Sequence, residues 1–257
     1  MSFDADLTAC AAIVEKGDPE RFSAAMASPV QARRVLFPLY AFNIEVSRAP
    51  WVTQEPMIAE MRLQWWRDAL EEIAAGGAVR RHEVVTPLSQ CLDADAAQIL
   101  ERAVAARRWD IYKDAFEDEA HFRAYLTETC AGIMRVSARA LGFSPNDEAT
   151  VALNALGYAT GLARFLRAVP ELEAQNRVPL LDGRAEAVAE LARSALSECP
   201  SHGRLCQLLG ADARAVVVES FLSRAVLGQV AGNPRRVADG TLGVGPVRRS
   251  LLLWRHS

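Results

Sequence analysis

The sequence predicts an all-α protein. Apolar residues recur at helical spacing along almost all of the 257 residues. No segment combines period-two alternation with the turn dipeptides that indicate strands. With 51% apolar residues, the chain is able to bury a full core without disulfides or structural metals. No linker or repeat divides it, so we expect a single domain over residues 1–257, with about ten helices.

Four helices are expected in the first third of the chain. In order, they are Leu7–Val14, 18–27, 30–48 and 55–77. Asp18 is a typical N-cap, and Pro19 follows at the first helical position, where a missing N–H costs nothing. Pro56 opens the fourth helix and Gly76 and Gly77 close it.

The remaining helices follow the same apolar periodicity. They are expected at 86–109, either as one helix or as a broken pair, and then at 120–142, 144–169, 184–199 and 211–229. Pro170 is expected to end the helix at 144–169, because proline removes a backbone donor and clashes with the preceding turn. The core then spans about residues 20–230, and a basic and apolar tail occupies 231–257.

Composition excludes several classes of function. A net charge of −3 and a pI near 5.9 argue against a nucleic-acid-binding surface, which needs concentrated positive charge. The five cysteines form no CxxC pair and are interpreted as reduced core residues, without structural metal or disulfides. The four histidines are spread along the chain, so we expect them to be isolated and to form no acid–base or metal site.

Location is predicted from the absence of export and membrane signals. The first residues lack a basic flank followed by an apolar run, so no signal peptide is expected. No apolar stretch is judged to approach the ~20 residues of a membrane span. We therefore expect a cytoplasmic protein, at most peripheral to the inner membrane.

The tail has two interpretations. Its arginines and the apolar segment Leu251–Trp254 could contact anionic lipid or a membrane-bound partner. Alternatively, this segment is a helix that docks its apolar face on the core. The arginines concerned are Arg235, Arg236, Arg248 and Arg249.

Four blocks resemble the squalene and phytoene synthase family of head-to-head prenyl transferases. They are RFSAAMASPVQARRVLFPLYAFN (21–43), MRLQWWRDALEEI (61–73), YLTETCAGIM (125–134) and GLARFLRAVPELEAQNRVPLL (161–181). The resemblance covers about residues 20–230 and implies the isoprenoid synthase fold, with helices around a central cavity. In active members, paired aspartates on facing helices hold Mg²⁺, a hard cation that requires oxygen ligands.

The metal-binding aspartates of this family are missing here. Counting from the family motifs, their positions hold Ser47, Arg48, Trp51, Ala168 and Leu172. None of these side chains offers a carboxylate, and a cationic arginine at such a position repels Mg²⁺. The resemblance therefore implies no catalytic residue, no metal site and no cofactor, and Mg²⁺ is expected only if the chain is nevertheless an enzyme.

Two other acid pairs have the spacing of a metal site. Asp114 with Asp118, and Asp68 with Glu72, lie four residues apart. Each has a simpler interpretation, because the first pair marks a solvated turn and helix start and the second lies on a polar helix face.

The residues at the motif positions are most similar to those of one branch of the family. This branch contains the mitochondrial respiratory complex I assembly factor and its bacterial relatives. Asn43 and Glu45 in AFNIEVSR, and Ala168 and Pro170 in FLRAVP, match that branch. The resemblance implies a non-catalytic protein that acts in assembly of a respiratory membrane complex, with its subunits as partners. The alternatives are a prenyl transferase with displaced metal ligands and a carrier of an isoprenoid or quinone-like lipid.

Nine polar residues are candidates for the cavity or a ligand. They are Arg33, Tyr40, Asn43, Glu45, Arg48, Arg164, Arg167, Glu171 and Arg177. A buried Glu45 requires a partner, for which an arginine at 48, 164 or 167 is expected. We interpret these residues as an arginine and glutamate network that fills the volume of the lost metals, or as a metal-free anion site, since guanidinium groups suit phosphate oxygens.

Overall fold

The computed structural model describes residues 5–144 and 146–256, and this part of the chain contains helices and no strand. The all-α prediction is confirmed. The first half holds α1 (Ala5–Gly17), α2 (Pro19–Met26), α3 (Val30–Arg48), α4 (Pro56–Ala74), α5 (Val85–Ser89), α6 (Ala94–Ala106) and the 3-10 turn η1 (Arg107–Asp110). The second half holds α7 (Glu119–Leu126), the π-helical segment η2 (Thr127–Ala131), α8 (Gly132–Ala140), α9 (Asp147–Ala174), α10 (Ala185–Glu198), α11 (His202–Val218), α12 (Ser223–Gly232), α13 (Arg235–Ala238) and α14 (Pro246–His256).

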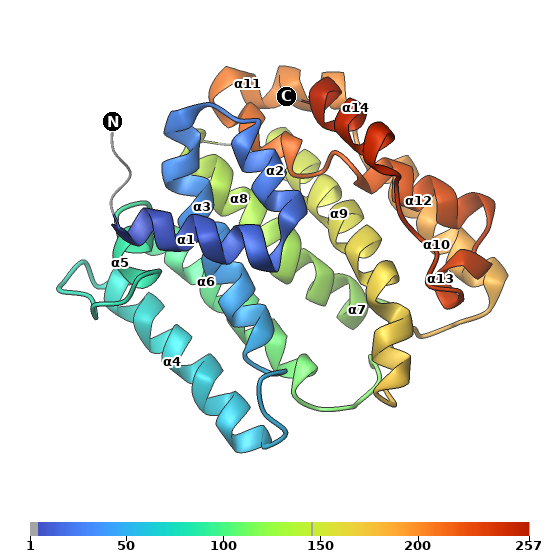
Figure 1. Ribbon diagram of the computed structural model, residues 1–257, viewed down its shortest axis with the longest axis horizontal. Helices are drawn as coiled ribbons and strands as arrows, with labels where there is room; N and C mark the ends of the chain where they lie inside the picture. Colours follow the sequence, from blue (N-terminus) through green and yellow to red (C-terminus); the bar gives the residue numbers. More distant parts are fainter. Residues whose placement is uncertain (1–4, 145, 257) are drawn as a thin grey trace.

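The core consists of two groups of buried side chains, and the helices that carry them are arranged around the middle of the molecule (Figure 1). One group lies among α1, α3, α4, α5 and α6, and the other surrounds the long helix α9 together with α7, α10, α11 and α12. Helix α3 packs against α1, and α9 packs against η2 and α12. The helices α3 and α9, which carry the two family motifs, therefore belong to different halves of the core.

Local sequence signals for helix ends are confirmed where side chains make the cap. The Asp18 carboxylate accepts a hydrogen bond from the backbone N–H of Arg21 at 2.9 Å, and Pro19 begins α2. Gly76 follows α4 with φ of +68°, a conformation in which a side chain would be strained. The segment 86–109 is the broken pair, with α5 and α6 separated by a short turn.

Three expectations about helices and apolar segments are wrong. Pro170 does not end its helix, because α9 continues to Ala174 with Leu172 buried against the core. The helix expected at 211–229 is broken between α11 and α12. One stretch, Ala213–Gly232, does reach the length and hydropathy of a membrane span, although 67% of it is buried in the protein, as in the core helix of a soluble fold.

Helix α9 approaches η2 so closely that only glycine fits at the crossing. A Cβ atom on Gly157 would lie 2.3 Å from the Cα atom of Ala131. Four residues further along α9, a Cβ atom on Gly161 would lie 3.0 Å from that of Cys130. This contact fixes the distance between the two helices that form one wall of the central cavity.

Candidate functional site

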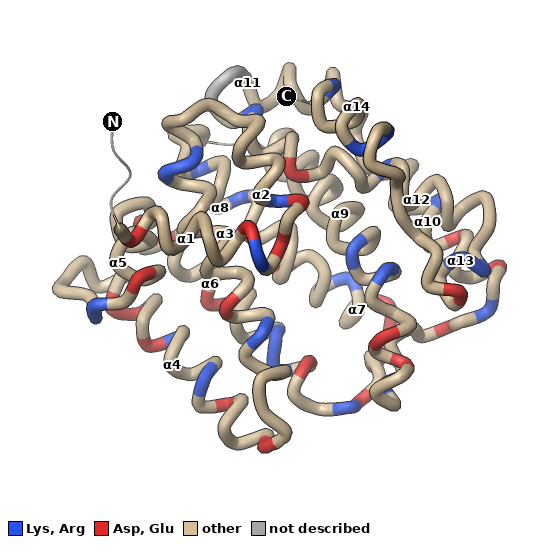
Figure 2. The backbone as a smooth tube through the Cα atoms, in the orientation of Figure 1, with Lys and Arg blue, Asp and Glu red and all other residues tan. Residues whose placement is uncertain are grey.

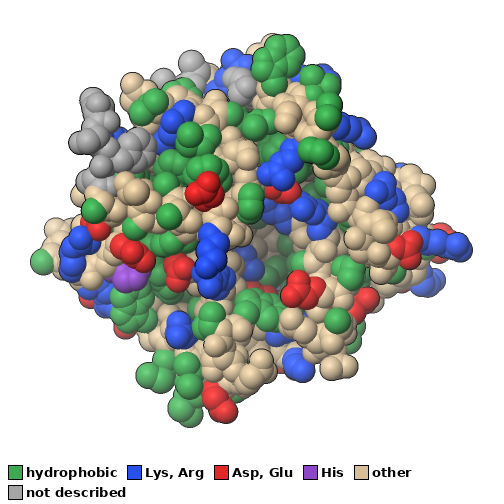
Figure 3. All heavy atoms as spheres, viewed as in Figure 1, with side chains coloured by type: hydrophobic (Ala, Val, Ile, Leu, Met, Phe, Trp, Pro, Cys, Tyr) green, Lys and Arg blue, Asp and Glu red, His purple; other side chains and the backbone are tan. Residues whose placement is uncertain are grey.

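A cavity of about 590 Å³ opens in the middle of the molecule, visible as the central hollow in Figure 3. Its walls come from the end of α1, the start of α2, α3, η1, α7, η2 and α9. The side chains at its surface include Arg21, Asn43, Ser47, Arg48, Trp51, Arg107, Asp110, Tyr125, Thr129, Cys130, Arg164, Phe165, Ala168, Glu171 and Leu172. A π-helical segment such as η2 is uncommon and occurs often at functional sites.

The two motif positions face one cavity from opposite helices. Ser47 and Arg48 line it from α3 and Trp51 from the turn that follows α3, and Ala168 and Leu172 line it from α9. These are the positions that carry paired aspartates in the resembling enzymes. Apart from the Ser47 hydroxyl, these side chains offer no oxygen, and none of them offers a carboxylate to hold Mg²⁺. The side chains present therefore do not fit the metal ions of the family.

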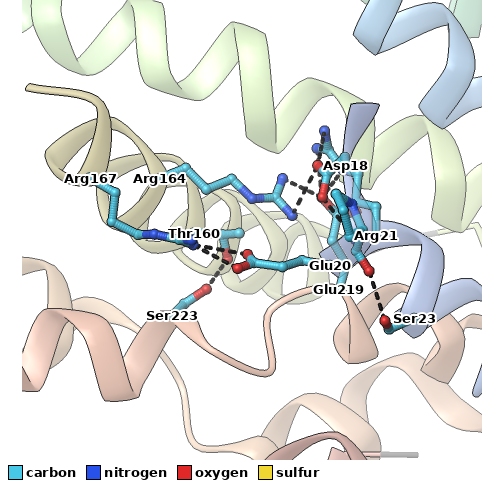
Figure 4. A network of polar contacts seen from close by, with 10 residues as sticks. Asp18, Glu20, Arg21, Ser23, Thr160, Arg164, Arg167, Glu219 and Ser223 are labelled. Atoms are coloured by element: carbon cyan, nitrogen blue, oxygen red, sulfur yellow. Dashed lines mark hydrogen bonds and ion pairs between the residues drawn. The ribbon is translucent and has the colours of Figure 1, made fainter. Parts of the chain in front are cut away.

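A buried ion-pair network lies behind one wall of this cavity (Figure 4). The Glu219 carboxylate, whose side chain is 0% exposed, binds Arg21 at 2.6 Å and Arg164 at 3.1 Å. Asp18 lies 3.6 Å from Arg21 and 3.9 Å from Arg164. Arg21 also lies over the ring of Tyr40, 5.1 Å from its centroid. Two guanidinium groups that face the cavity are therefore neutralised from behind by two acids.

The charges in this network shift one another's protonation. Burial favours the neutral form of Asp18, but the guanidinium groups of Arg164 and Arg21 outweigh this effect and hold its pKa below the ordinary value. Burial likewise opposes the charge of Arg164, yet Asp18 and Glu219 raise the pKa of this guanidinium. Burial, and then the nearby Glu219 carboxylate, raise the pKa of Tyr40 well above its ordinary value. Asp18 and Arg164 are therefore ionised near neutral pH, whereas the Tyr40 phenol stays neutral.

A second polar group lies on another part of the cavity wall. Arg107 donates to Asp110 at 3.1 Å and to the Tyr125 hydroxyl at 2.9 Å, and this hydroxyl donates to Asp110 at 2.9 Å. Burial raises the pKa of Tyr125, and Asp110 adds to this rise. Arg177 closes the group from outside by donating to the main-chain oxygens of Asp110 and Tyr112. The charges of Arg107 and Asp110 neutralise each other within this triad, as the charges of the first network do.

Arg48 is the guanidinium of the cavity with the weakest acidic partner. Its side chain is 57% exposed, and its nearest carboxylate is Glu45 at 3.6 Å. The cavity also contains one carboxylate, Glu171, for which no ion pair is recorded among the described residues. Within residues 5–144 and 146–256, no three His, Cys, Asp or Glu side chains converge as a metal site.

Four of the nine candidate residues line the cavity and five lie elsewhere. Those that line it are Asn43, Arg48, Arg164 and Glu171. Arg33 instead donates to the main-chain oxygens of Met26 and Ser28, where it closes the turn after α2. The prediction that Arg33 lines the cavity is therefore wrong, because its guanidinium binds those carbonyls instead.

The other displaced candidates have structural partners. Tyr40 is fully buried behind Arg21, and Arg167 pairs with Glu20 at 2.8 Å. Arg177 donates to main-chain carbonyls and lies over the Trp51 ring, 4.7 Å from its centroid. These three side chains belong to the supporting structure of the cavity and not to its surface.

Glu45 faces away from the cavity, into a separate surface hollow of about 440 Å³. This hollow lies between α3 and α4 and is also lined by Trp65, Trp66 and His82. Of the arginines expected to pair with Glu45, Arg48 does so. The arginine and glutamate network behind the cavity therefore exists, but its glutamate is Glu219 and not Glu45.

Several network residues were missed from the sequence. From the sequence, Asp18 is predicted only as an N-cap, and neither Arg21 nor Asp110 has a predicted role. Glu219 interrupts the apolar run AVVVESFL, and a lone acid in such a run requires a buried partner. This lone acid predicts a buried partner, but the sequence does not identify which arginine that partner is.

The alternative acid pairs serve structural roles. Asp118 is the N-cap of α7 and accepts from the backbone N–H of His121 at 2.8 Å. Asp68 accepts from Gln64, and Glu72 binds Arg80 at 2.6 Å. Their interpretation as a helix start and a polar helix face is confirmed.

The histidines are not all isolated, which corrects the expectation. The rings of His202 in α11 and His256 in α14 pack with centroids 4.6 Å apart. The Cys206 thiol lies 3.4 Å from Nε2 of His202, and Nδ1 of His256 lies 2.8 Å from the Leu252 oxygen. The pair joins α14 to α11.

Acidification is expected to destabilise this junction. Burial, the partner His256 and nearby arginines lower the pKa of His202 below its ordinary 6.5, and burial and arginines lower that of His256. The arginines are Arg214, Arg224 and Arg255. Since the unfolded chain then binds protons more readily, stability is lost as pH falls through 6.5 toward the lowered values. Urea unfolding at several pH values should give a steeper loss for the natural chain than for the variant His202→Gln/His256→Gln. Identical pH profiles would contradict this expectation.

The fold and the two motif helices place this protein in a known class. The chain belongs to the squalene/phytoene synthase family, which it matches over residues 14–220. It is similar to a dehydrosqualene synthase structure, with a TM-score of 0.78 and 17% identity over 98% of this chain and 95% of the other. It is also similar to squalene synthase HpnC from Alicyclobacillus acidocaldarius, with a TM-score of 0.71 and 17% identity over 93% and 95% of the two chains. These likenesses concern the fold.

Curated relatives point to one branch of that family. The chain is 29% identical over 178 residues to the complex I assembly factor 6 homolog of Drosophila melanogaster, covering 67% of this chain and 53% of the relative. It is 23% identical over 181 residues to NADH dehydrogenase (ubiquinone) complex I, assembly factor 6 of Homo sapiens, covering 66% and 51%. The chain thus spans about half the length of the curated relatives it matches. The resemblance expected from the motifs is confirmed.

Proposed function

We propose that this protein acts in assembly of a respiratory membrane complex of the complex I type, as a family member that does not ionise prenyl diphosphates. One observation carries the non-catalytic part. The five positions that face the cavity in place of the family's aspartates are Ser47, Arg48, Trp51, Ala168 and Leu172. The likeness to assembly factor 6 proteins supports the assembly part. Its partners are then subunits or assembly intermediates of that complex, reached from the cytoplasm at the inner membrane.

Deletion and capture test the assembly role. In the organism that encodes it, deletion is expected to lower NADH:ubiquinone oxidoreductase activity while succinate oxidation is preserved, and the full chain should restore the loss. A tagged chain, captured from native membranes under mild detergent, should recover subunits of that complex. Recovery of soluble isoprenoid enzymes alone, with unchanged NADH oxidation after deletion, contradicts the proposal.

Metal independence is a separate expected outcome. Calorimetry with farnesyl diphosphate should give the same affinity, within about twofold, with and without Mg²⁺, because Arg48 stands where a carboxylate would bind the ion. A family member that retains the paired aspartates serves as the positive control. Mg²⁺-dependent release of pyrophosphate from radiolabelled substrate would instead support the prenyl transferase alternative.

A second candidate function is carriage of an isoprenoid or quinone-like lipid. The cavity volume of about 590 Å³ lies within the range of small-molecule sites. Leu126, Phe165 and Leu172 add apolar side chains to its lining. Organic extraction of the purified chain, followed by mass spectrometry, should recover a stoichiometric lipid if this function holds. Extracts without such a lipid, from protein purified without detergent, exclude it.

A further inference from the structure

Helix α14 has an inner face that holds it on the protein. Leu252 and Leu253 are half-buried against the core group around α9, and His256 packs on His202. In Figure 1, α14 lies on the outside of the molecule beside α11 and α12. The helix is therefore anchored from one side, and this anchoring fixes which side chains point outward.

The outer face of α14 presents an apolar stripe to solvent. Val247 is 85% exposed, Leu251 is 54% exposed and Trp254 is 74% exposed. Their spacing of four and three residues places them along one side of a helix. Single exposed apolar residues need no explanation, but three large ones aligned on an eleven-residue helix form a directed surface.

Positive charge accompanies this stripe. Arg248 and Arg255 are exposed and lie beside Leu251 on the helical wheel, and Pro246–His256 contains no acidic residue. Figure 2 shows basic positions and no acidic position along α14. In Figure 3, hydrophobic and basic side chains gather together on this part of the surface. The chain as a whole carries a net charge of −3, so this cationic face is a local feature.

We propose that α14 is an interfacial helix that binds the chain to a bilayer containing anionic lipid. Val247, Leu251 and Trp254 enter the headgroup and acyl boundary, where indole rings are favoured, and Arg248 and Arg255 contact the anionic headgroups. The helix lies along the surface, because its inner face is occupied by the core and because eleven residues are too few to span a bilayer. The proposal combines the two interpretations of the tail, because the inner face of α14 docks on the core and the outer face binds lipid. This inference rests on α14 alone and does not depend on the assembly role.

Sedimentation with vesicles tests the proposal on the full chain. The chain is expected to bind vesicles of phosphatidylcholine mixed with phosphatidylglycerol more tightly than vesicles of phosphatidylcholine alone, and added salt should weaken this binding. Trp254→Ser should weaken it at least about tenfold. Arg248→Gln and Arg255→Gln should each weaken it about fivefold.

A matched control separates the stripe from general surface hydrophobicity. Val151→Ser removes a side chain that is also exposed, on α9, and should leave vesicle binding unchanged. Because all of these side chains are exposed, the variants should keep the thermal unfolding midpoint of the natural chain. Fluorescence quenching by brominated lipid should fall in Trp254→Phe relative to the natural chain. Absent binding to anionic vesicles at low salt, or equal loss in Val151→Ser and Trp254→Ser, overturns the proposal.

Discussion

Glu219→Ala is expected to lower the free energy of unfolding by about 3–5 kcal/mol, because it leaves the buried Arg21 and the partly buried Arg164 without their shared acid. Arg21 and Arg164 both bind this carboxylate, and its side chain has no exposed surface. Asp18 remains, but at 3.6 and 3.9 Å it is too distant to replace the lost contacts. Urea unfolding followed by circular dichroism measures the change.

The control for this prediction is a second ion pair in the same region. Glu20 binds Arg167 at 2.8 Å, but the arginine side chain is partly exposed. Glu20→Ala should therefore cost no more than about 1 kcal/mol. The double variant Glu219→Ala/Arg164→Met should recover part of the loss, because one orphaned cation is removed. If Glu219→Ala costs no more than Glu20→Ala, the buried network does not stabilise the fold.

Gly157→Ala should also be strongly destabilising, by about 3 kcal/mol, since overpacking a rigid contact forces backbone to move. The added Cβ atom would lie 2.3 Å from Cα of Ala131 and 2.9 Å from its backbone nitrogen. Neither atom belongs to a flexible side chain, so α9 and η2 must separate. That movement would also widen the cavity between them.

A matched glycine gives the opposite expectation. Gly228 lies within α12, and a Cβ atom there would meet nothing within 4 Å. Gly228→Ala should therefore stabilise the protein by about 0.5–1 kcal/mol, through helix propensity alone. Chemical denaturation of both variants checks the pair. Equal shifts in the same direction would show that the close approach of α9 and η2 is not rigid.

Helix positions could be predicted from the sequence because their causes are local. The apolar periodicity, the Asp18 cap and the broken segment at 86–109 depend on residues within a few turns of one another. Errors arose where packing overrides these local rules. Pro170 is tolerated inside α9 because the helix buries Leu172 beyond it, and the α11–α12 break occurs within an apolar run that reads as continuous.

The missing acids at the family's metal positions could also be seen without a structure. Ser47, Arg48 and Ala168 carry no carboxylate in any conformation, so their chemistry is decided by identity alone. The structure adds that these positions, from α3 and α9, face one cavity. It also moves Glu45 to another surface, because α3 turns that side chain toward α4.

Residue types and their near neighbours thus decided the helical class, the family and the loss of paired aspartates. Which charges meet was decided only by the packing of distant helices. Arg21 and Glu219 are 198 residues apart, and they form one ion pair because α2, α9 and the α11–α12 break converge behind the cavity. Periodicity records which side of a helix is buried, but it holds no information about which helix lies opposite. Solvent screens charges that are more than ~10 Å apart, so a partner is defined only after the core has brought the helices together.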